Sequence, residues 1–376
     1  DMLRASWLPA EEPIRLWLDR TIPEQDGPGA ALAVFEEGGR TLPAVVADET
    51  GIRFLFDPDR AIAEVQDESY LRPRRPAHSY LPLPYQLVPG RLRLQAFRLL
   101  LSLRRRGADP GFPGWPREPS LEALRGAVLR CWQLATGRAA EPALWPAGKR
   151  YALALSHDVD TASGFARIPE IAALEEAHGF RSCWFVVGRQ YAIDHALLED
   201  LRGRGHEIAL HGDLHDNRIA YQSPAGIERR LERCVPFLAR HGVSGFRSPS
   251  LLETPRLRAA LRSRFLYTSD VPDSEKDSLA APRRGCASCF PFLKEGLLEI
   301  PISLPFDDKL LLSGCTEAGL LDAWRAKLLL HAEPHLWRRT RASYARWLRE
   351  QSADGEAWRA SLGEVARWWL ERKPNG

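Results

Sequence analysis

The feature that most restricts the fold of this chain is a regular alternation of apolar runs and helical stretches that begins near residue 151. Seven apolar runs of strand length occur in order, at residues 151–156, 183–187, 207–210, 245–247, 265–268, 298–301 and 327–331. Stretches typical of helices lie between most of them, at residues 169–178, 195–204, 224–241, 255–263 and 316–326. Such alternation predicts a parallel sheet covered by helices, and this many strands in about 180 residues favour a distorted (β/α)7 barrel of the TIM type.

Residues 1–148 lack this alternation, and we expect them to form a smaller α/β domain that precedes the barrel. Its predicted elements are an amphipathic stretch, three strands, a Pro-rich connection and two helices, at residues 11–20, 31–35, 42–46, 52–56, 72–89, 92–106 and 120–136. Residues 149–376 then hold the barrel and two Trp-rich helices at 340–351 and 356–372, which we expect to pack outside it.

Composition excludes several classes of protein. With 52 basic and 49 acidic residues the chain is close to charge balance, which gives no general attraction to nucleic acid. Six cysteines are too few for a disulfide scaffold in 376 residues. Cys286 and Cys289 form a CxxC pair, but no second pair completes a zinc ribbon, so we interpret them as ordinary thiols.

The sequence also bears on the location of the protein. No run reaches the roughly 18 apolar residues needed to cross a bilayer, and no basic segment followed by an apolar core marks a leader. These features predict that there is no transmembrane segment. If Met2 is the natural start we expect a cytoplasmic location, whereas a trimmed leader stays open because Asp1 precedes Met2.

Polar residues that can do chemistry stand at the ends of the predicted strands. These residues are Asp158, Asp160, His211, His215, Arg247, Asp270 and His331. The carboxyl ends of parallel barrel strands meet at one face, so residues far apart in sequence are expected to come together there. Two histidines four positions apart can share one ion, and with one carboxylate they make a typical catalytic zinc set that leaves a position open for water.

The same residues resemble the motifs of a known family, the NodB-type polysaccharide deacetylases of carbohydrate esterase family 4. The resemblance covers residues 151–334, and the motifs occur in the family's order. They are Ser-His-Asp-Val-Asp at 156–160, His-Gly-Asp-Leu-His at 211–215, Arg-Ser-Pro-Ser at 247–250 and Leu-Leu-His at 329–331. The resemblance implies the fold of the NodB homology domain for this part of the chain.

Carried over to this sequence, the resemblance implies a metal site and the groups beside it. Asp160, His211 and His215 would hold the ion, for which Zn²⁺ is the first expectation and Co²⁺, Ni²⁺ or Mn²⁺ are alternatives. Asp158 would take a proton from water, and Arg247 would pair with Asp158 and keep it ionised.

The resemblance also implies an acid and an oxyanion site. His331 would donate a proton to the departing amine, with Asp270 as the first candidate to orient it and Asp273 as the second. Two positions depart from the family pattern, because Gly212 replaces a hydroxyl residue and Ser250 replaces a tyrosine. A backbone N–H near Ser250 would still be available to stabilise an oxyanion.

The activity implied is hydrolysis of the N-acetyl groups of an amino-sugar glycan, in an exopolysaccharide, a cell wall or a lipid-linked saccharide. One alternative is a small-molecule amidase similar to the allantoinases of the same fold. Another is a catalytically inactive, glycan-binding relative. Loss of the base or of a ligand would indicate the inactive relative, and all of these residues are present.

Several other residues near the site have structural interpretations. His157 is expected to be a packed neighbour of the site, and His335 is a reserve for His331. Most of the 12 Trp residues should lie in cores. Trp115 and Trp184 are the candidates for platforms on which a sugar ring stacks.

Overall fold

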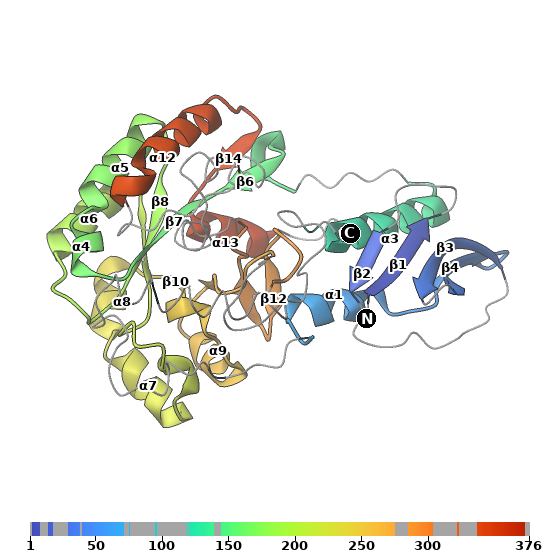
Figure 1. The fold of residues 1–376 in the computed structure, drawn as a ribbon, viewed down its shortest axis with the longest axis horizontal. Helices are drawn as coiled ribbons and strands as arrows, with labels where there is room; N and C mark the ends of the chain where they lie inside the picture. The colour runs from blue at the N-terminus through green and yellow to red at the C-terminus, as the bar shows by residue number, and fades with distance from the viewer. Residues whose placement is uncertain are drawn as a thin grey trace.

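The computed structural model of the protein describes residues 2–7, 14–17, 29–37, 40–70, 75, 95, 118, 120–138, 144–274, 285–303, 322 and 337–372. These residues form a larger, mostly parallel sheet with helices packed on both of its faces, and a smaller antiparallel sheet near the N-terminus (Figure 1). None of the described helices combines the length and the apolar character that crossing a membrane requires.

The larger sheet has the strand order β12-β13-β11-β10-β9-β8-β7. In this order the strands span Phe292–Lys294, Leu297–Glu299, Tyr267–Thr268, Gly245–Phe246, Glu207–Leu210, Ser182–Val186 and Leu155–Val159. Every neighbouring pair is parallel except β12 and β13. The predicted α/β class is therefore confirmed, while pairing that would close the sheet into a ring is not found among the described residues.

The hairpin of β12 and β13 was not predicted. Its turn consists of Glu295 and Gly296, whose φ angles are +49° and +78°. Two successive residues with positive φ give the tight turn whose twist matches that of an antiparallel pair. The Glu-Gly pair lies just before the predicted strand at 298–301, so the local signal was present in the sequence.

Helices cover the outer face of the sheet on the left of Figure 1. They are α5 (Ile168–Ala177), α6 (His195–Gly203), α7 (Pro224–Glu232), α8 (Val235–His241), α9 (Pro255–Leu261) and α12 (Trp337–Ser352). Between them and the sheet lies the main core, to which the strands contribute Val159, Trp184, Val186, Ile208, Leu210 and Phe246. The short helix α4 (Ala162–Phe165) follows β7 directly.

One predicted helix is two helices. The stretch 224–241 breaks between Glu232 and Val235, and Pro236 stands in the first turn of α8. Proline has no backbone N–H and clashes with the preceding turn, so a continuous helix cannot pass through it. The prediction of a single helix was therefore wrong at this position.

The last helix, α13 (Leu362–Glu371), lies on the inner face of the sheet, which corrects the expectation that it packs outside. Its residues Leu362, Val365 and Ala366 pack against Phe185 and Ala209 of the sheet. These strand positions alternate with those that face the outer helices, and alternate residues of a strand point to opposite faces. Figure 1 shows α13 across the sheet from α5, α6 and α12.

The beginning of the predicted helix at 356–372 is a strand. Residues of β14 (Ala357–Arg359) pair in parallel with β6 (Tyr151–Leu153). The helix starts only after Ser361, which forms a capping box with Glu364. Such a box satisfies two backbone N–H groups and fixes the first turn of a helix.

The smaller sheet is antiparallel and has the order β2-β1-β3-β4-β5. Its strands span Ile14–Trp17, Met2–Trp7, Ala30–Glu37, Arg40–Asp48 and Gly51–Phe54, and α1 (Pro58–Gln66) and α3 (Ser120–Thr136) accompany them. The three predicted strands and the helix at 120–136 are confirmed. The amphipathic stretch at 11–20 contains β2, and β1 was not predicted.

Contacts join α1 and α3 to the segment that follows residue 284. Val65, Leu121 and Ala287 form one small core, and the hydroxyl of Tyr70 donates to the carbonyl of Gly285 at 2.6 Å. A domain boundary at residue 148 stays a prediction. Apart from isolated positions, the elements predicted at 72–89, 92–106, 316–326 and 327–331 lie outside the described residues.

Candidate metal centre

The register of the parallel strands brings the predicted ligands to one edge of the sheet. The last residues of five neighbouring strands are aligned, namely Val159, Val186, Leu210, Phe246 and Thr268. Asp160, His211 and Arg247 each directly follow one of these residues. Their convergence therefore comes from strand pairing, as the carboxyl ends of parallel strands predict.

Three side chains at this edge have the geometry of a metal site. Asp160, His211 and His215 each offer a ligand atom, and these atoms lie within 4.8 Å of one another. Nε2 of His211 is 3.3 Å from Oδ1 of Asp160, and Nε2 of His215 is 3.3 Å from Oδ2 of the same carboxylate. Ligand atoms held at 2.0–2.1 Å by one tetrahedral ion are separated by about 3.3–3.4 Å.

The hydrogen bonding of His211 points to a cation rather than to a simple polar contact. Its Nδ1 lies 2.9 Å from the carbonyl oxygen of Arg247, which can only accept, so Nδ1 carries a hydrogen. In a neutral ring Nε2 is then an acceptor, and it faces Oδ1 of Asp160, a buried oxygen without a hydrogen-bond partner among the described residues. Two acceptors that face each other fit a shared ion, so the residues present fit the implied metal.

The charges of the site favour an ionised carboxylate. Burial opposes ionisation, but His215 and His211 outweigh it and lower the pKa of Asp160 to about 2. Burial and the nearby His211 lower the pKa of His215, which keeps that ring neutral. For His211 burial is outweighed by Asp158 and Asp160, which raise its pKa. An ionised carboxylate and a neutral imidazole are the forms that bind metal, so Asp160 and His215 are shifted toward these forms, and His211 would release its proton as an ion binds.

Asp158 and Arg247 form a buried ion pair beside the three candidate metal ligands. Nη1 of Arg247 donates to Oδ1 of Asp158 at 2.8 Å, and Oδ2 of Asp158 is 3.9 Å from Nε2 of His211. The guanidinium also stacks on the ring of Phe185 at 4.1 Å. Both members of the pair are at most 5% exposed. Asp158 is thus held close to the metal ligands with one of its oxygens directed at them.

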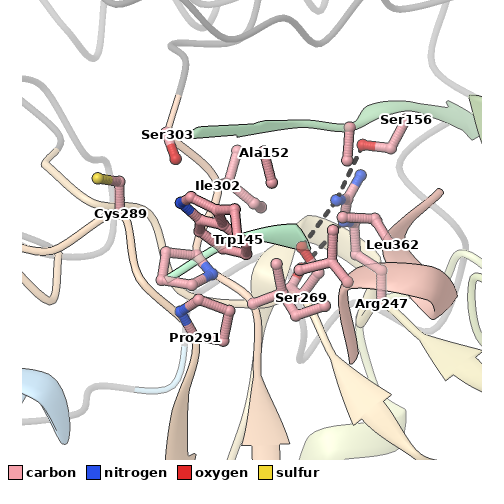
Figure 2. A pocket seen from close by; sticks show the side chains of 14 residues that line it. Trp145, Ala152, Ser156, Arg247, Ser269, Cys289, Pro291, Ile302, Ser303 and Leu362 are labelled. Atoms are coloured by element: carbon pink, nitrogen blue, oxygen red, sulfur yellow. Dashed lines mark hydrogen bonds between the residues drawn. The ribbon is translucent and has the colours of Figure 1, made fainter. Parts of the chain in front are cut away.

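A cavity lies on the inner face of the sheet next to this pair (Figure 2). Arg247 lines it together with Ser156 and Ser269, whose hydroxyls accept from Nη2 of Arg247 at 3.1 and 2.8 Å. Apolar side chains, among them Trp145 and Leu362 of α13, form much of the remaining wall. Arg247 therefore belongs both to the ion pair of the metal centre and to the wall of this cavity.

The loop that carries the two histidines is fixed from several sides. Gln190 bridges it to the first strand, because its Nε2 donates to the Asp160 carbonyl at 2.8 Å and its Oε1 accepts from the His215 N–H at 2.7 Å. Nε of Arg230 on α7 donates to Oδ1 of Asp213 at 2.6 Å. Sequence reasoning missed both residues, and no local pattern around Gln190 would have indicated it.

The glycine that departs from the family motif has a local explanation. Gly212 has a φ of +73°, and a Cβ atom at this position would lie 2.9 Å from Cγ of Pro249. Both the backbone conformation and the close approach of Pro249 therefore require glycine. Ser250, the other departure, is exposed with a φ of +54°.

Asp270 lies at the same edge of the sheet but is bound to the loop after β10. Both of its carboxylate oxygens accept from Ser248, and burial followed by the charges of Glu299 and Glu253 raises its pKa to about 7. Asp273 accepts from the N–H of Ser274. His331, which Asp270 was predicted to orient, lies outside the described residues, as do His335 and Trp115.

Two expectations about neighbouring residues have clear outcomes. His157 is a packed neighbour, as expected, because it is buried and its Nε2 lies 2.6 Å from Oε1 of Glu175. Trp184 is fully buried and stacks on His157 at 4.4 Å between ring centroids, so it is not a platform for sugar. Cys286 and Cys289 form no disulfide, and their interpretation as ordinary thiols stays a prediction.

Comparison with known proteins found similar solved structures but no similar family model or curated sequence. No model of a protein family matches the chain, and no curated protein matches it in sequence. A structure named as a polysaccharide deacetylase from Mycobacterium smegmatis is 23% identical with a TM-score of 0.49, over 61% of this chain and 93% of that chain. A polysaccharide deacetylase from Pseudomonas aeruginosa PAO1 is 15% identical with a TM-score of 0.49, over 65% and 98%.

An allantoinase structure is similar to the same extent. It is 15% identical with a TM-score of 0.50, over 63% of this chain and 96% of that chain. At these identities the likeness concerns the fold. Structures named as polysaccharide deacetylases, the family whose motifs the sequence resembles, are among the solved structures that are similar to this chain.

Proposed function

We propose that the protein is a metal-dependent amide hydrolase that removes N-acetyl groups from an amino-sugar glycan. The observation that carries the proposal is the arrangement of Asp160, His211 and His215, whose facing acceptor atoms have the spacing of ligands of one tetrahedral ion. The buried pair of Asp158 and Arg247 beside them supplies a base. Together these are the parts that metal-assisted hydrolysis requires.

The chain's own residues have separate roles in this proposal. When bound, a divalent ion such as Zn²⁺ would polarise the acyl carbonyl and acidify a water molecule. Asp158 accepts the proton of the attacking water, and Arg247 keeps that carboxylate ionised and oriented. A backbone N–H near Ser250 is proposed to donate to the oxyanion. His331 is proposed to return a proton to the departing amine.

A small-molecule amidase is the second candidate, because an allantoinase has this fold with a TM-score of 0.50. Both candidates use the same ligands and base. They differ in substrate, since one hydrolyses an acetamide on a sugar and the other an amide of a small ureide. Substrate specificity is therefore the property that separates them.

The test is metal analysis of the purified chain combined with a hydrolysis screen. We expect stoichiometric Zn²⁺, Co²⁺, Ni²⁺ or Mn²⁺ and release of acetate from N-acetylated oligosaccharides, with allantoin left intact. The Asp158→Asn variant is the control, because it should bind the ion without turnover. Hydrolysis of allantoin without acetate release would favour the amidase. A loaded chain that hydrolyses neither class would support the inactive, glycan-binding relative.

A further inference from the structure

Asp270 holds the loop that follows β10 by two hydrogen bonds. The backbone N–H of Ser248 donates to its Oδ1 at 2.6 Å, and Oγ of Ser248 donates to its Oδ2 at 3.0 Å. Asp270 is 1% exposed and Ser248 is fully buried. In this environment water cannot replace these bonds, so the position of the Ser248 N–H is set by the carboxylate.

The same peptide group also touches a metal ligand. The carbonyl that precedes the Ser248 N–H is that of Arg247, and it accepts from Nδ1 of His211 at 2.9 Å. Because a peptide group is planar, fixing its N–H also fixes its carbonyl. When Asp270 is ionised, its negative charge on the N–H side polarises the group and makes the carbonyl a stronger acceptor. Asp270 thus acts on the ring of His211 through one rigid unit.

Asp270 is itself fixed by a second buried carboxylate. Oε1 of Glu299 accepts from the N–H groups of Asp270 and Val271 at 2.5 and 2.9 Å. Its Oε2 accepts from Oγ1 of Thr268 at 2.6 Å and from Arg258 at 3.1 Å. Glu299 is fully buried. The backbone that carries Asp270 is therefore anchored in the sheet next to β13.

We propose that Asp270 is a positioning residue of the metal centre, which orients His211 through the peptide group shared by Arg247 and Ser248. This inference rests on the proposed function in one respect, since it requires that the site binds a metal ion. Hydrogen-bonded partners of metal-ligating histidines fix the ring and tune its basicity. Their loss typically costs about 10-fold to 100-fold in metal affinity.

The experiment compares the zinc affinity of folded variants by competition with a chelator. We expect Asp270→Ala to bind Zn²⁺ about 10-fold to 100-fold more weakly than the wild type, and its Co²⁺ form to have an altered visible absorption spectrum. Asp270→Asn should lie in between, because its Oδ1 can still accept from the Ser248 N–H. Ser248→Ala, which removes only the hydroxyl, should show the smallest loss of zinc affinity.

The matched control is Glu207→Ala. Glu207 is a half-buried carboxylate of this sheet, but it lies at the amino end of β9, away from His211. We expect this variant to lower the melting temperature and to leave zinc affinity and the Co²⁺ spectrum unchanged. A positioning role is thereby separated from a general loss of packing.

The outcomes distinguish this inference from the proposed function. A folded Asp270→Ala chain with the zinc affinity and Co²⁺ spectrum of the wild type would overturn the positioning role. If that variant does not fold, wild-type affinity in both Asp270→Asn and Ser248→Ala overturns it instead. Weakened zinc binding in a chain that hydrolyses no acylated substrate would retain the positioning role and refute the deacetylase. A wild-type chain that binds none of these ions refutes both.

Discussion

The two ends of the larger sheet each hold carboxylates, but the hydrogen bonding of these carboxylates differs between the ends. At the amino end, Glu207 accepts from the hydroxyl of Tyr267 at 2.9 Å and from the N–H of Gly363 at 2.7 Å. At the carboxyl end, Oδ1 of Asp160 has no hydrogen-bond partner in the part of the chain that the structure describes, and it faces the ring of His211. A buried polar atom without a hydrogen-bond partner is costly, and a cation bound at Oδ1 of Asp160 would remove that cost.

The comparison of Glu207 with Asp160 indicates which of these two carboxylates has a structural role. The Glu207 carboxylate joins strand β9 to the first turn of α13, and the fold itself supplies its hydrogen-bond donors. The Asp160 carboxylate, in the proposed function, is completed by a cation. Substitution of Glu207 should therefore change the stability of the fold, whereas substitution of Asp160 should change metal binding.

The largest effect is expected from removal of a ligand. In His215→Ala the site keeps one imidazole and one carboxylate, and we expect loss of stoichiometric metal and of all hydrolysis. Metal analysis after dialysis measures the first, and acetate release measures the second. Retention of a full equivalent of metal with native affinity would contradict the assignment of His215 as a ligand.

The base should give the next largest effect. Asp158→Asn keeps the size of the side chain but cannot accept the proton of water, so we expect turnover to fall by about 10²-fold to 10⁴-fold. Metal content should stay at the wild-type level, since Asp158 is not one of the proposed ligands. If this variant loses the ion, the roles of Asp158 and Asp160 have been exchanged.

At the amino end the expected change concerns the free energy of unfolding. Glu207→Ala leaves the N–H of Gly363 and the hydroxyl of Tyr267 without their acceptor, and each buried unsatisfied group costs about 1–3 kcal/mol. Urea denaturation of the metal-free chain measures this loss. A variant as stable as the wild type would show that water enters this end of the sheet.

The smallest effect is a pH dependence of stability. Burial raises the pKa of Glu207 above its ordinary value of 4.5, so the unfolded chain releases this proton at a lower pH than the folded chain. The contribution of Glu207 to the free energy of unfolding should therefore fall as the pH rises from 4.5 toward the raised pKa. The free energy of unfolding of Glu207→Gln, measured against pH, is subtracted from that of the wild type to isolate the contribution of Glu207. A difference that does not change with pH would contradict the raised pKa of Glu207.

Sequence patterns were sufficient to predict which residues lie at the carboxyl ends of the strands. The apolar runs before Asp158, His211 and Arg247 placed these residues at one edge, because strand direction alone decides that outcome. The side of the sheet that α13 covers could not be predicted, since an apolar stripe on a helix does not say which face of a sheet it meets. Gln190 was missed for a related reason, because its two contacts come from loops distant in sequence.

The inner position of α13 has a consequence for how the chain matures. Gly363 in the first turn of α13 donates to the carboxylate of Glu207 in β9, and Gly363 lies 156 positions later in the sequence. During synthesis the strands therefore emerge long before the helix that shields their inner side chains. Before α13 has been synthesised, Phe185 and Ala209 must contact solvent, a chaperone or another segment of the chain. The inner face of this sheet is therefore covered by α13 only after translation has passed residue 366.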